Sequence, residues 1–500
     1  MHLRIMLGLV AAVALGANAE VKVASVFTDN AVLQQGVAVP VWGTAEPGEQ
    51  ITVSFGDQKK SVKADAKGDW SVKLSKMKAN AEPQSLTVAG KNCVALTNLL
   101  VGEVWICSGQ SNMEFPLSRA ANAKEATAVC ADPLLRLFLV AKANTDEPQK
   151  SVIGSWKLCD SNTAPGFSAV GYFFGRDLRT ARKVPVGLIG TYWGGTPAES
   201  WTRRDVLEKN PLLAGILTNQ EHRVATWDPA KAKKDYDFQK AKWTNEVAKA
   251  KAAGKTPPNG PRMAADPKTD PHRPACLYNA MIAPLVPYAI RGATWYQGES
   301  NAGRSKEYET LLPAMIKNWR DDFGVGAFPF LIVQISTYQG QPPTIREAQL
   351  HIAKNTKNTA MIVSADVGNE TDIHPTQKEP VGGRLALAAR DLAYGEEVEF
   401  TGPMFEKMKV SGSKAVLTFD EATGGLVAKD GQLKNFVIAE AGTTNFVPAT
   451  ATIVGKDKIE VSAESVKVPG AVRYGWANYF VADLFDKSGL PASPFRTDDK

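Results

Sequence analysis

Between residues 101 and about 396, short apolar runs alternate with longer stretches whose apolar positions recur with a helical period. The runs cover Glu103–Cys107, Val186–Tyr192, Gly292–Tyr296, Phe328–Ile335 and Met361–Ala365. Buried strands that alternate with helices are typical of a mostly parallel sheet with helices on both faces. The pattern therefore predicts a central α/β domain of the doubly wound type.

The two flanks of this central part show a different pattern. Residues 20–100 contain short alternating or β-branched runs such as Ile51–Phe55, separated by turns rich in Gly and Pro, and predict a β-sandwich-like domain. Residues 397–500 repeat this character, for example in Ala415–Phe419, and predict a C-terminal β domain. A Lys-, Ala- and Asp-rich insert at about 203–274 interrupts the central domain, and we expect it to form charged helices that face solvent.

The first 19 residues have the pattern of a signal peptide, with a short positive start, the apolar stretch Ile5–Gly16 and the small-residue site Ala17–Ala19. About 12 apolar residues are too few to span a bilayer, which takes roughly 20. No later segment approaches that length, so no membrane insertion is expected. The sequence thus predicts signal peptide 1–19 and an exported chain, periplasmic or secreted, that begins at Glu20.

The composition is that of an ordinary globular protein. The chain has 500 residues, of which 44% are hydrophobic and 22% charged, and its formal net charge is +6. No run of basic residues concentrates this charge, so a nucleic-acid partner is not expected. Neither composition nor pattern indicates an oligomeric state.

The cysteines do not resemble a disulfide framework, because they are odd in number and widely scattered: Cys93, Cys107, Cys130, Cys159 and Cys276. One bridge, between Cys130 and Cys159, is the candidate pairing. Cys107 lies in an apolar strand and is expected to be a buried small hydrophobe. The chain has no CxxC or HExxH pattern, so no metal and no other cofactor is expected.

Four of the predicted central strands end in polar or Gly-rich sequences. These sequences are Ser108–Glu114, Trp193–Trp201, Gln297–Ala302 and Asp366–Pro375. Ligands of open parallel sheets bind at the carboxyl ends of the strands, which all lie at one edge. The four sequences together therefore predict one site.

Ser111 and His374 are the candidate catalytic pair of this site. Ser111 follows a Gly-containing turn and is expected to begin a helix, where backbone N–H groups stabilise negative charge. A serine becomes a good nucleophile when a base, usually histidine, takes its proton. Of the 5 histidines, only His374 follows a core strand at this edge; His272, for example, lies in a Pro-rich segment of the charged insert. A serine at a helix start is ordinarily an N-cap, but the joint placement of these residues favours catalysis.

These motifs resemble those of a known family. Gly109–Met113, Gly194–Gly195, Gln297–Ser300 and Asp372–Pro375 look like the sialate O-acetylesterase group of the SGNH/GDSL hydrolases, over residues of about 100 to 395. The resemblance implies a flavodoxin-like SGNH hydrolase domain at 101–396 that removes acetyl esters from sugars without a metal. It also implies that Ser111 is the nucleophile and His374 the base, and that the Ser111 and Gly195 amides form part of the oxyanion hole.

The sequence departs from the family pattern in two places. The usual Asp three residues before the catalytic His is replaced by Thr371, so Asp372 and the Glu299 of the Gln-Gly-Glu motif are alternative partners for His374, with Asp372 slightly ahead. Either carboxylate is expected to raise the pKa of His374 above its ordinary value of about 6.5. The oxyanion motif of the superfamily supplies an Asn, and we expect Gln297 to replace it, because an amide can donate a hydrogen bond and an ionised Glu299 cannot.

The sequence therefore predicts an exported, metal-independent serine esterase whose substrate is an acetylated carbohydrate. Sialic acids are the expected substrate through the family resemblance. Acetylated xylan or another plant glycan is the alternative, because the motifs match the ester and not the sugar. A second alternative is a glycan-binding protein with an inactive esterase core, against which the intact Ser111 and His374 argue.

Overall fold

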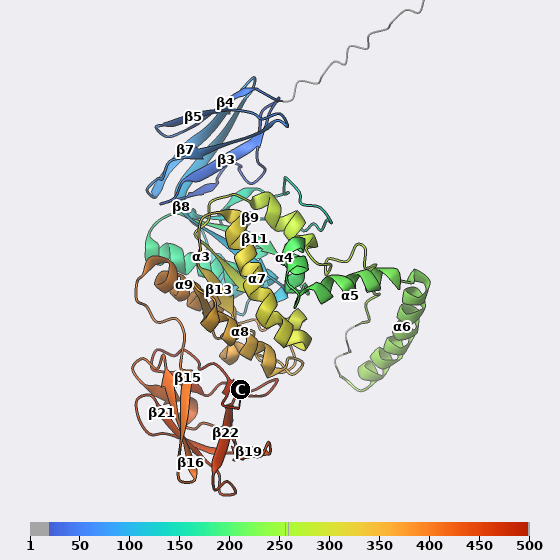
Figure 1. Cartoon of the computed structure of the whole chain (residues 1–500), viewed down its shortest axis with the longest axis vertical. Helices are drawn as coiled ribbons and strands as arrows, with labels where there is room; N and C mark the ends of the chain where they lie inside the picture. Colours follow the sequence, from blue (N-terminus) through green and yellow to red (C-terminus); the bar gives the residue numbers. More distant parts are fainter. Residues whose placement is uncertain (1–19, 256, 259, 499–500) are drawn as a thin grey trace, which may run out of the picture.

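The computed structural model describes residues 20–255, 257–258 and 260–498, and the predicted signal peptide lies outside this range. Strands near the N-terminus (blue) and strands near the C-terminus (orange to red) occupy opposite ends of the molecule, with a helix-flanked sheet between them (Figure 1). Within the described residues, no helix has the length and apolarity needed to cross a bilayer. The predicted mixed α/β class is confirmed.

The central sheet contains the strands β10, β9, β11, β8, β12, β13 and β14 in this spatial order. Their bounds are Trp156–Cys159, Asp132–Leu139, Val186–Tyr192, Cys93–Gly109, Gly292–Tyr296, Phe330–Val333 and Thr359–Ile362. Neighbours are parallel except β10 with β9. Numbered along the chain from β8, the parallel strands lie in the order 2-3-1-4-5-6, because β11 pairs with both β9 and β8. The flavodoxin order is 2-1-3-4-5, so the expected flavodoxin-like topology needs this correction.

Helices cover both faces of the central sheet. Helices α3 (Ala169–Arg182) and α9 (Glu379–Tyr394) pack together on one face, and α7 (Ser305–Phe323) and α8 (Pro343–Asn355) pack together on the other. Neighbouring strand residues point to opposite faces, so each helix pair has its own share of the core.

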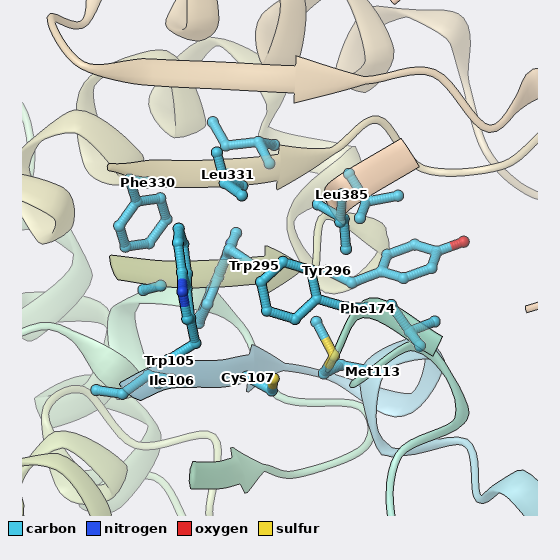
Figure 2. Close-up of a cluster of buried hydrophobic side chains, with 14 of the residues drawn as sticks. Trp105, Ile106, Cys107, Met113, Phe174, Trp295, Tyr296, Phe330, Leu331 and Leu385 are labelled. Carbon is cyan, nitrogen blue, oxygen red and sulfur yellow. The ribbon is translucent and has the colours of Figure 1, made fainter. Parts of the chain in front are cut away.

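Two tryptophans illustrate this division of the core. Trp105 of β8 meets Phe174 of α3 edge-on, with 5.2 Å between ring centroids, and Trp295 of β12 meets Trp319 of α7 at 5.9 Å. Both tryptophans are fully buried, and Figure 2 shows them beside the strands among other apolar side chains. Such buried aromatic residues stabilise a core strongly, so the strand ends that bear the site stand on a rigid base.

Strand β8 is a continuous strand of 17 residues that belongs both to the N-terminal part and to the central sheet. Its first half pairs with β7 and β2, and its second half with β11 and β12. The N-terminal strands are β1 (Lys22–Val23), β2 (Val32–Gln34), β3 (Val39–Thr44), β4 (Gln50–Phe55), β5 (Gln58–Lys63), β6 (Asp69–Leu74) and β7 (Asn80–Ala89). Position 100, where the sequence suggested a domain boundary, lies inside β8.

The residues after α9 form short antiparallel sheets. Their strands are β15 (Met404–Ser411), β16 (Lys414–Asp420), β17 (Leu426–Ala428), β18 (Phe436–Glu440), β19 (Phe446–Pro448), β20 (Thr450–Ile453), β21 (Lys458–Ser462), β22 (Pro469–Tyr474), β23 (Leu484–Asp486) and β24 (Phe495–Arg496). The fully buried Arg346 of α8 donates hydrogen bonds to the carbonyls of Ala477 and Asn478. The loop after β22 is thereby attached to the central part of the molecule.

The charged insert contains α4 (Arg204–Lys209), α5 (Ala214–Ala225) and α6 (Pro229–Ala252). Helix α6 buries none of its residues and projects to the side of the molecule (Figure 1), as a solvent-facing charged helix should. The end of the insert differs, because Asp270 and Arg273 are buried. Leu207 of α4 and Ile216 and Leu217 of α5 are buried as well, so the expectation of a wholly solvent-facing insert is wrong outside α6.

All five cysteines are free. The candidate bridge between Cys130 and Cys159 is not formed; instead the Cys159 thiol donates a hydrogen bond to the Cys130 carbonyl at 3.2 Å. Cys107 is fully buried in β8, as expected from its apolar surroundings.

Candidate active site

A cavity of about 1020 Å³ is lined by Ser111, which follows β8, and by His374, which follows β14. These two residues thus lie together after the carboxyl ends of their strands, as predicted. The cavity wall also contains the cationic side chains of Arg119, Lys142 and Lys157 and apolar side chains such as Phe167. This volume lies just above the range typical of small-molecule sites, roughly 300–1,000 Å³.

The turn before Ser111 is tied to the strands on both sides of β8. Gly109 has a φ of +138°, and a Cβ there would lie 2.2 Å from the Tyr296 carbonyl oxygen, so only glycine fits. The Gln110 N–H donates to that same carbonyl at 3.0 Å, and the Trp193 N–H donates to the Gly109 carbonyl at 3.1 Å. Helix α1 (Ser111–Glu114) begins directly after this turn and α2 (Ala123–Ala128) follows it. The backbone of Ser111 is therefore held by its neighbours.

The Gly194–Gly195 loop lies against Ser111. A Cβ on Gly194 would be 3.2 Å from the Ser111 Cβ, and Gly195 has a φ of +81°. The Gly194 N–H donates to Glu114 Oε2 at 2.6 Å, and the other oxygen of Glu114 pairs with Lys142. The Gly195 carbonyl accepts hydrogen bonds from Ser300 Oγ and from His272 Nε2, both at 2.7 Å. Among the described residues, no acceptor takes the Gly195 N–H.

Asp372 is the carboxylate next to His374. Its Oδ1 accepts the His374 backbone N–H at 2.8 Å and lies 3.6 Å from Nδ1 of the ring. Burial lowers the pKa of His374, and this effect outweighs the opposing charge of Asp372; Lys378 and Arg119 lower the pKa further. Asp372 does raise the pKa of His374, but the expectation that it lifts the pKa above the ordinary value is wrong, because the ring loses more by desolvation than it gains from the largely exposed Asp372.

Glu299 lies in a different network. Its Oε1 accepts a hydrogen bond from Asn112 Nδ2 at 2.7 Å, and Asn112 Oδ1 accepts one from Lys378 Nζ at 2.6 Å. Asn112 Nδ2 also donates to the Ile373 carbonyl at 3.0 Å. Asn112 thus joins the loops that contain Ser111, Glu299 and His374. In the described chain, neither oxygen of Glu299 makes a hydrogen bond to the His374 ring.

Burial controls the charges at the two ends of this network. It lowers the pKa of Lys378 to about 7, while the nearby Glu299 acts in the opposite direction. It also raises the pKa of Glu299, whose Oε2 is buried without a hydrogen-bond partner. Each group therefore depends on the other to stay charged inside the protein.

Gln297 does not offer its amide to the cavity. The side chain is fully buried, and its Nε2 donates to the Thr196 carbonyl at 3.3 Å and to Asn301 Oδ1 at 2.7 Å. Its Oε1 accepts from Tyr308 at 2.8 Å. Both N–H groups have protein acceptors, so the predicted use of Gln297 as an oxyanion donor needs correction.

Sequence reasoning missed three residues that contact the catalytic loops: Glu114, His272 and Lys378. Glu114 lies one turn after Ser111 and Lys378 lies four residues after His374, so their proximity to the motifs was a usable signal. His272 had no comparable signal, because it is far from the motifs in the sequence. In the described part of the chain, no group of three or more His, Cys, Asp or Glu residues could hold a metal ion.

Comparisons with known proteins extend the likeness to nearly the whole chain. Residues 271–390, which include His272, Glu299 and His374, match the family described as carbohydrate esterase, sialic acid-specific acetylesterase. The sialate O-acetylesterases of Homo sapiens and Rattus norvegicus are each 29% identical over 94% and 97% of this chain and over 91% and 96% of their own. The crystal structure of a carbohydrate acetylesterase from Xanthomonas citri is 35% identical, covers 96% of this chain and 100% of its own, and superposes with a TM-score of 0.80.

Proposed function

Because this chain belongs to the carbohydrate esterase family of sialic acid-specific acetylesterases, and is accordingly a carboxylic ester hydrolase, we propose that it removes O-acetyl groups from sialic acids. The observation that supports this proposal most directly is the cavity shared by Ser111, His374 and cationic side chains. A glycan-binding protein with an inactive core is set aside, because both catalytic residue types face the same cavity.

In the proposed mechanism, Ser111 Oγ attacks the acetyl carbonyl while His374 takes the hydroxyl proton. The tetrahedral intermediate collapses to an acetyl-enzyme, and His374 gives the proton to the departing sugar oxygen. Water then attacks the acetyl-enzyme with His374 again as base, which releases acetate and restores Ser111. The site needs no metal for these steps.

The backbone amides of Ser111 and Gly195 are the proposed oxyanion donors. Glu114 already occupies the Gly194 N–H, whereas the Gly195 N–H has no acceptor among the described residues and lies on the loop that touches Ser111. Preorganised donors of this kind stabilise the charge that develops in the transition state. Gln297 is left out of this hole, because its amide is engaged elsewhere.

Asp372 is the proposed partner of His374, and Glu299 is assigned to holding Asn112 instead. Asp372 already binds the His374 backbone and lies near its Nδ1. The His374 ring needs only a small adjustment to bring Nδ1–H into hydrogen-bond range, and catalytic hydrogen bonds are often long in unliganded sites. Export through residues 1–19 remains part of the proposal and is supported by the sequence pattern alone.

The cations of the cavity wall support an acidic sugar as substrate. Arg119 and Lys157 are exposed, line the cavity and have no carboxylate partner in the described chain, while Lys142 is paired with Glu114. A substrate carboxylate could accept hydrogen bonds from these two cations, of which Arg119 lies over the Phe115 ring, and charge-assisted bonds are about twice as strong as neutral ones. Acetylated xylan or another neutral glycan remains the second candidate, because the cavity is large enough for more than one sugar ring.

Arg119→Gln tests the choice between these substrates. We expect the KM for an O-acetylated sialic acid to rise roughly tenfold, which corresponds to the loss of one charge-assisted hydrogen bond. The kcat and KM for aryl acetate should stay within about twofold of the wild type. Assays at about pH 8 keep His374 deprotonated in both proteins. Lys124→Gln, an exposed lysine of α2 outside the cavity wall, is the matched control. Faster release of acetate from acetyl-xylan than from any O-acetylated sialic acid would replace the proposed substrate by the second candidate.

The pH profile tests the role of His374. Catalysis needs the neutral ring, and burial lowers its pKa, so activity should persist below the ordinary histidine value of about 6.5 and decline only at lower pH. The measurement is kcat/KM for aryl acetate between about pH 4 and 9. An acidic limb with an apparent pKa above about 7 would mean that a carboxylate raises the pKa of His374 by more than burial lowers it, contrary to the geometry described above.

A further inference from the structure

A second histidine–aspartate pair contacts the Gly194–Gly195 loop, which lies against Ser111. His272 Nδ1 hydrogen-bonds Asp270 Oδ1, and His272 Nε2 hydrogen-bonds the Gly195 carbonyl at 2.7 Å. Both residues come from the end of the charged insert. Nothing in the proposed acyl transfer uses them.

The partners of the ring define its protonation state. A carboxylate and a carbonyl oxygen are both acceptors, so both ring nitrogens must donate, and only the doubly protonated imidazolium can do so. The neutral ring would turn a lone pair toward one of the two oxygens. The hydrogen bond to Asp270 accordingly raises the pKa of His272, although partial burial opposes this.

The surroundings of the pair are also charged. Arg223 of α5 donates to the other oxygen of Asp270 at 2.9 Å. Burial would raise the pKa of Asp270, but the hydrogen bonds from His272 and Arg223 lower it overall, so the carboxylate is ionised. The charge of Arg223 acts against protonation of His272, and the neighbouring Arg273 is directed to Asp146 and the Lys268 carbonyl instead.

The Gly195 N–H belongs to the peptide between Gly194 and Gly195, whose two neighbouring peptides are each anchored. Glu114 holds the preceding peptide through the Gly194 N–H. His272 and Ser300 hold the following peptide through the Gly195 carbonyl. Glycine backbones rotate freely, so without these anchors the N–H between them would have no defined direction.

We propose that His272 is a positioning residue of the oxyanion hole: as an imidazolium braced by Asp270, it holds the Gly195 carbonyl and thereby directs the Gly195 N–H toward the reacting centre. The proposal rests on the function proposed above. It assigns a role to the end of the charged insert, since Arg223 and Asp270 orient the ring that contacts the catalytic loop. It also predicts a dependence on pH. When the imidazolium of His272 loses a proton, the ring can donate only one of its two hydrogen bonds, to Asp270 or to the Gly195 carbonyl.

Substitutions at His272 and Asp270 test the proposal, with aryl acetate as the substrate and kcat and KM followed from about pH 6 to 10. In His272→Ala, kcat should fall roughly tenfold or more with KM nearly unchanged, because an oxyanion contact acts in the transition state. In His272→Gln, the amide can still donate to Gly195, so activity should be largely retained while the alkaline decline of the wild type disappears. In Asp270→Asn, that decline should move to lower pH.

Histidine Cε1–H NMR of the full chain gives an independent readout. The His272 resonance, assigned by its loss in His272→Gln, should titrate above the ordinary pKa of about 6.5 and with the alkaline decline in activity, and it should shift downward in Asp270→Asn. His222→Gln, an exposed histidine of α5, is the matched control and should change neither readout.

Specific outcomes overturn the proposal. These are a kcat of His272→Ala within about twofold of wild type, an alkaline decline that persists in His272→Gln, or a His272 resonance that titrates at or below about 6.5. Hydrolysis of aryl acetate without release of acetate from sialic acids refutes the proposed substrate and leaves the kinetic test of His272 intact. If the wild type hydrolyses no ester at all, the proposed function fails. The His272 titration in wild type and Asp270→Asn alone then decides whether the ring is an imidazolium held by its hydrogen bond to Asp270.

Discussion

In Ser111→Ala, kcat for aryl acetate is expected to fall by about three orders of magnitude or more, as is typical when a catalytic nucleophile is removed. Ser111 lines the cavity together with His374 and lies against the Gly194–Gly195 loop, so its substitution removes the hydroxyl that would form the acetyl-enzyme at this position. The fold should be preserved, because Ser111 is only partly buried and its hydroxyl makes no hydrogen bond among the described residues. Thermal unfolding and kinetics of the purified variant test both statements.

Ser118→Ala provides the matched control, since Ser118 is an exposed serine seven residues further along the same chain segment and does not line the cavity. It should behave as the wild type. Ser111→Ala with a kcat within about tenfold of wild type and an unchanged Tm contradicts the assignment of the nucleophile.

Asp372→Asn and Glu299→Gln are expected to have different effects on kcat and Tm. Asp372→Asn removes the charge that stabilises the His374 imidazolium, so kcat should fall roughly 10²–10³-fold, less than the ~10⁴ of a buried triad aspartate, because Asp372 is largely exposed. Because Asp372 raises the pKa of His374, its loss should also move the acidic limb to lower pH. The Tm should barely change.

Glu299→Gln, in contrast, should lower Tm clearly and kcat by about tenfold or less. Gln can still accept the Asn112 hydrogen bond, but the buried Lys378 loses its nearest opposing charge, and an uncompensated buried charge is strongly destabilising. The pKa of Lys378, already lowered to about 7, should fall further. If Glu299→Gln abolishes turnover at an unchanged Tm while Asp372→Asn remains near normal, Glu299 orients His374 and the assignment is reversed.

The location of the site could be predicted from sequence, because it follows from a repetitive pattern. Apolar runs that alternate with helices place Ser111 and His374 at the same edge of a parallel sheet, and the cavity indeed contains both. The mixed α/β class follows from the same pattern. Local strand and helix periodicity was sufficient for these conclusions.

The directions of individual side chains could not be predicted in this way. The motif containing Gln297 indicated that an amide is present, but Asn301 and Tyr308 decide where it points. The segment around His272 has the composition of a solvent-exposed turn, and it reaches the Gly195 loop through contacts with α5 that involve residues almost 50 positions away. Such tertiary contacts have no periodic trace in the sequence.

The continuity of β8 has a consequence for how a long glycan would meet the enzyme. Carbohydrate-recognising modules joined by flexible linkers sample many orientations, whereas here the N-terminal strands share hydrogen-bonded ladders with the very strand that leads to Ser111. Rotation of the N-terminal strands would have to break those ladders, so no hinge is available between Cys93 and Gly109. A polymer bound to the N-terminal strands would therefore reach the cavity at one fixed distance and in one fixed direction.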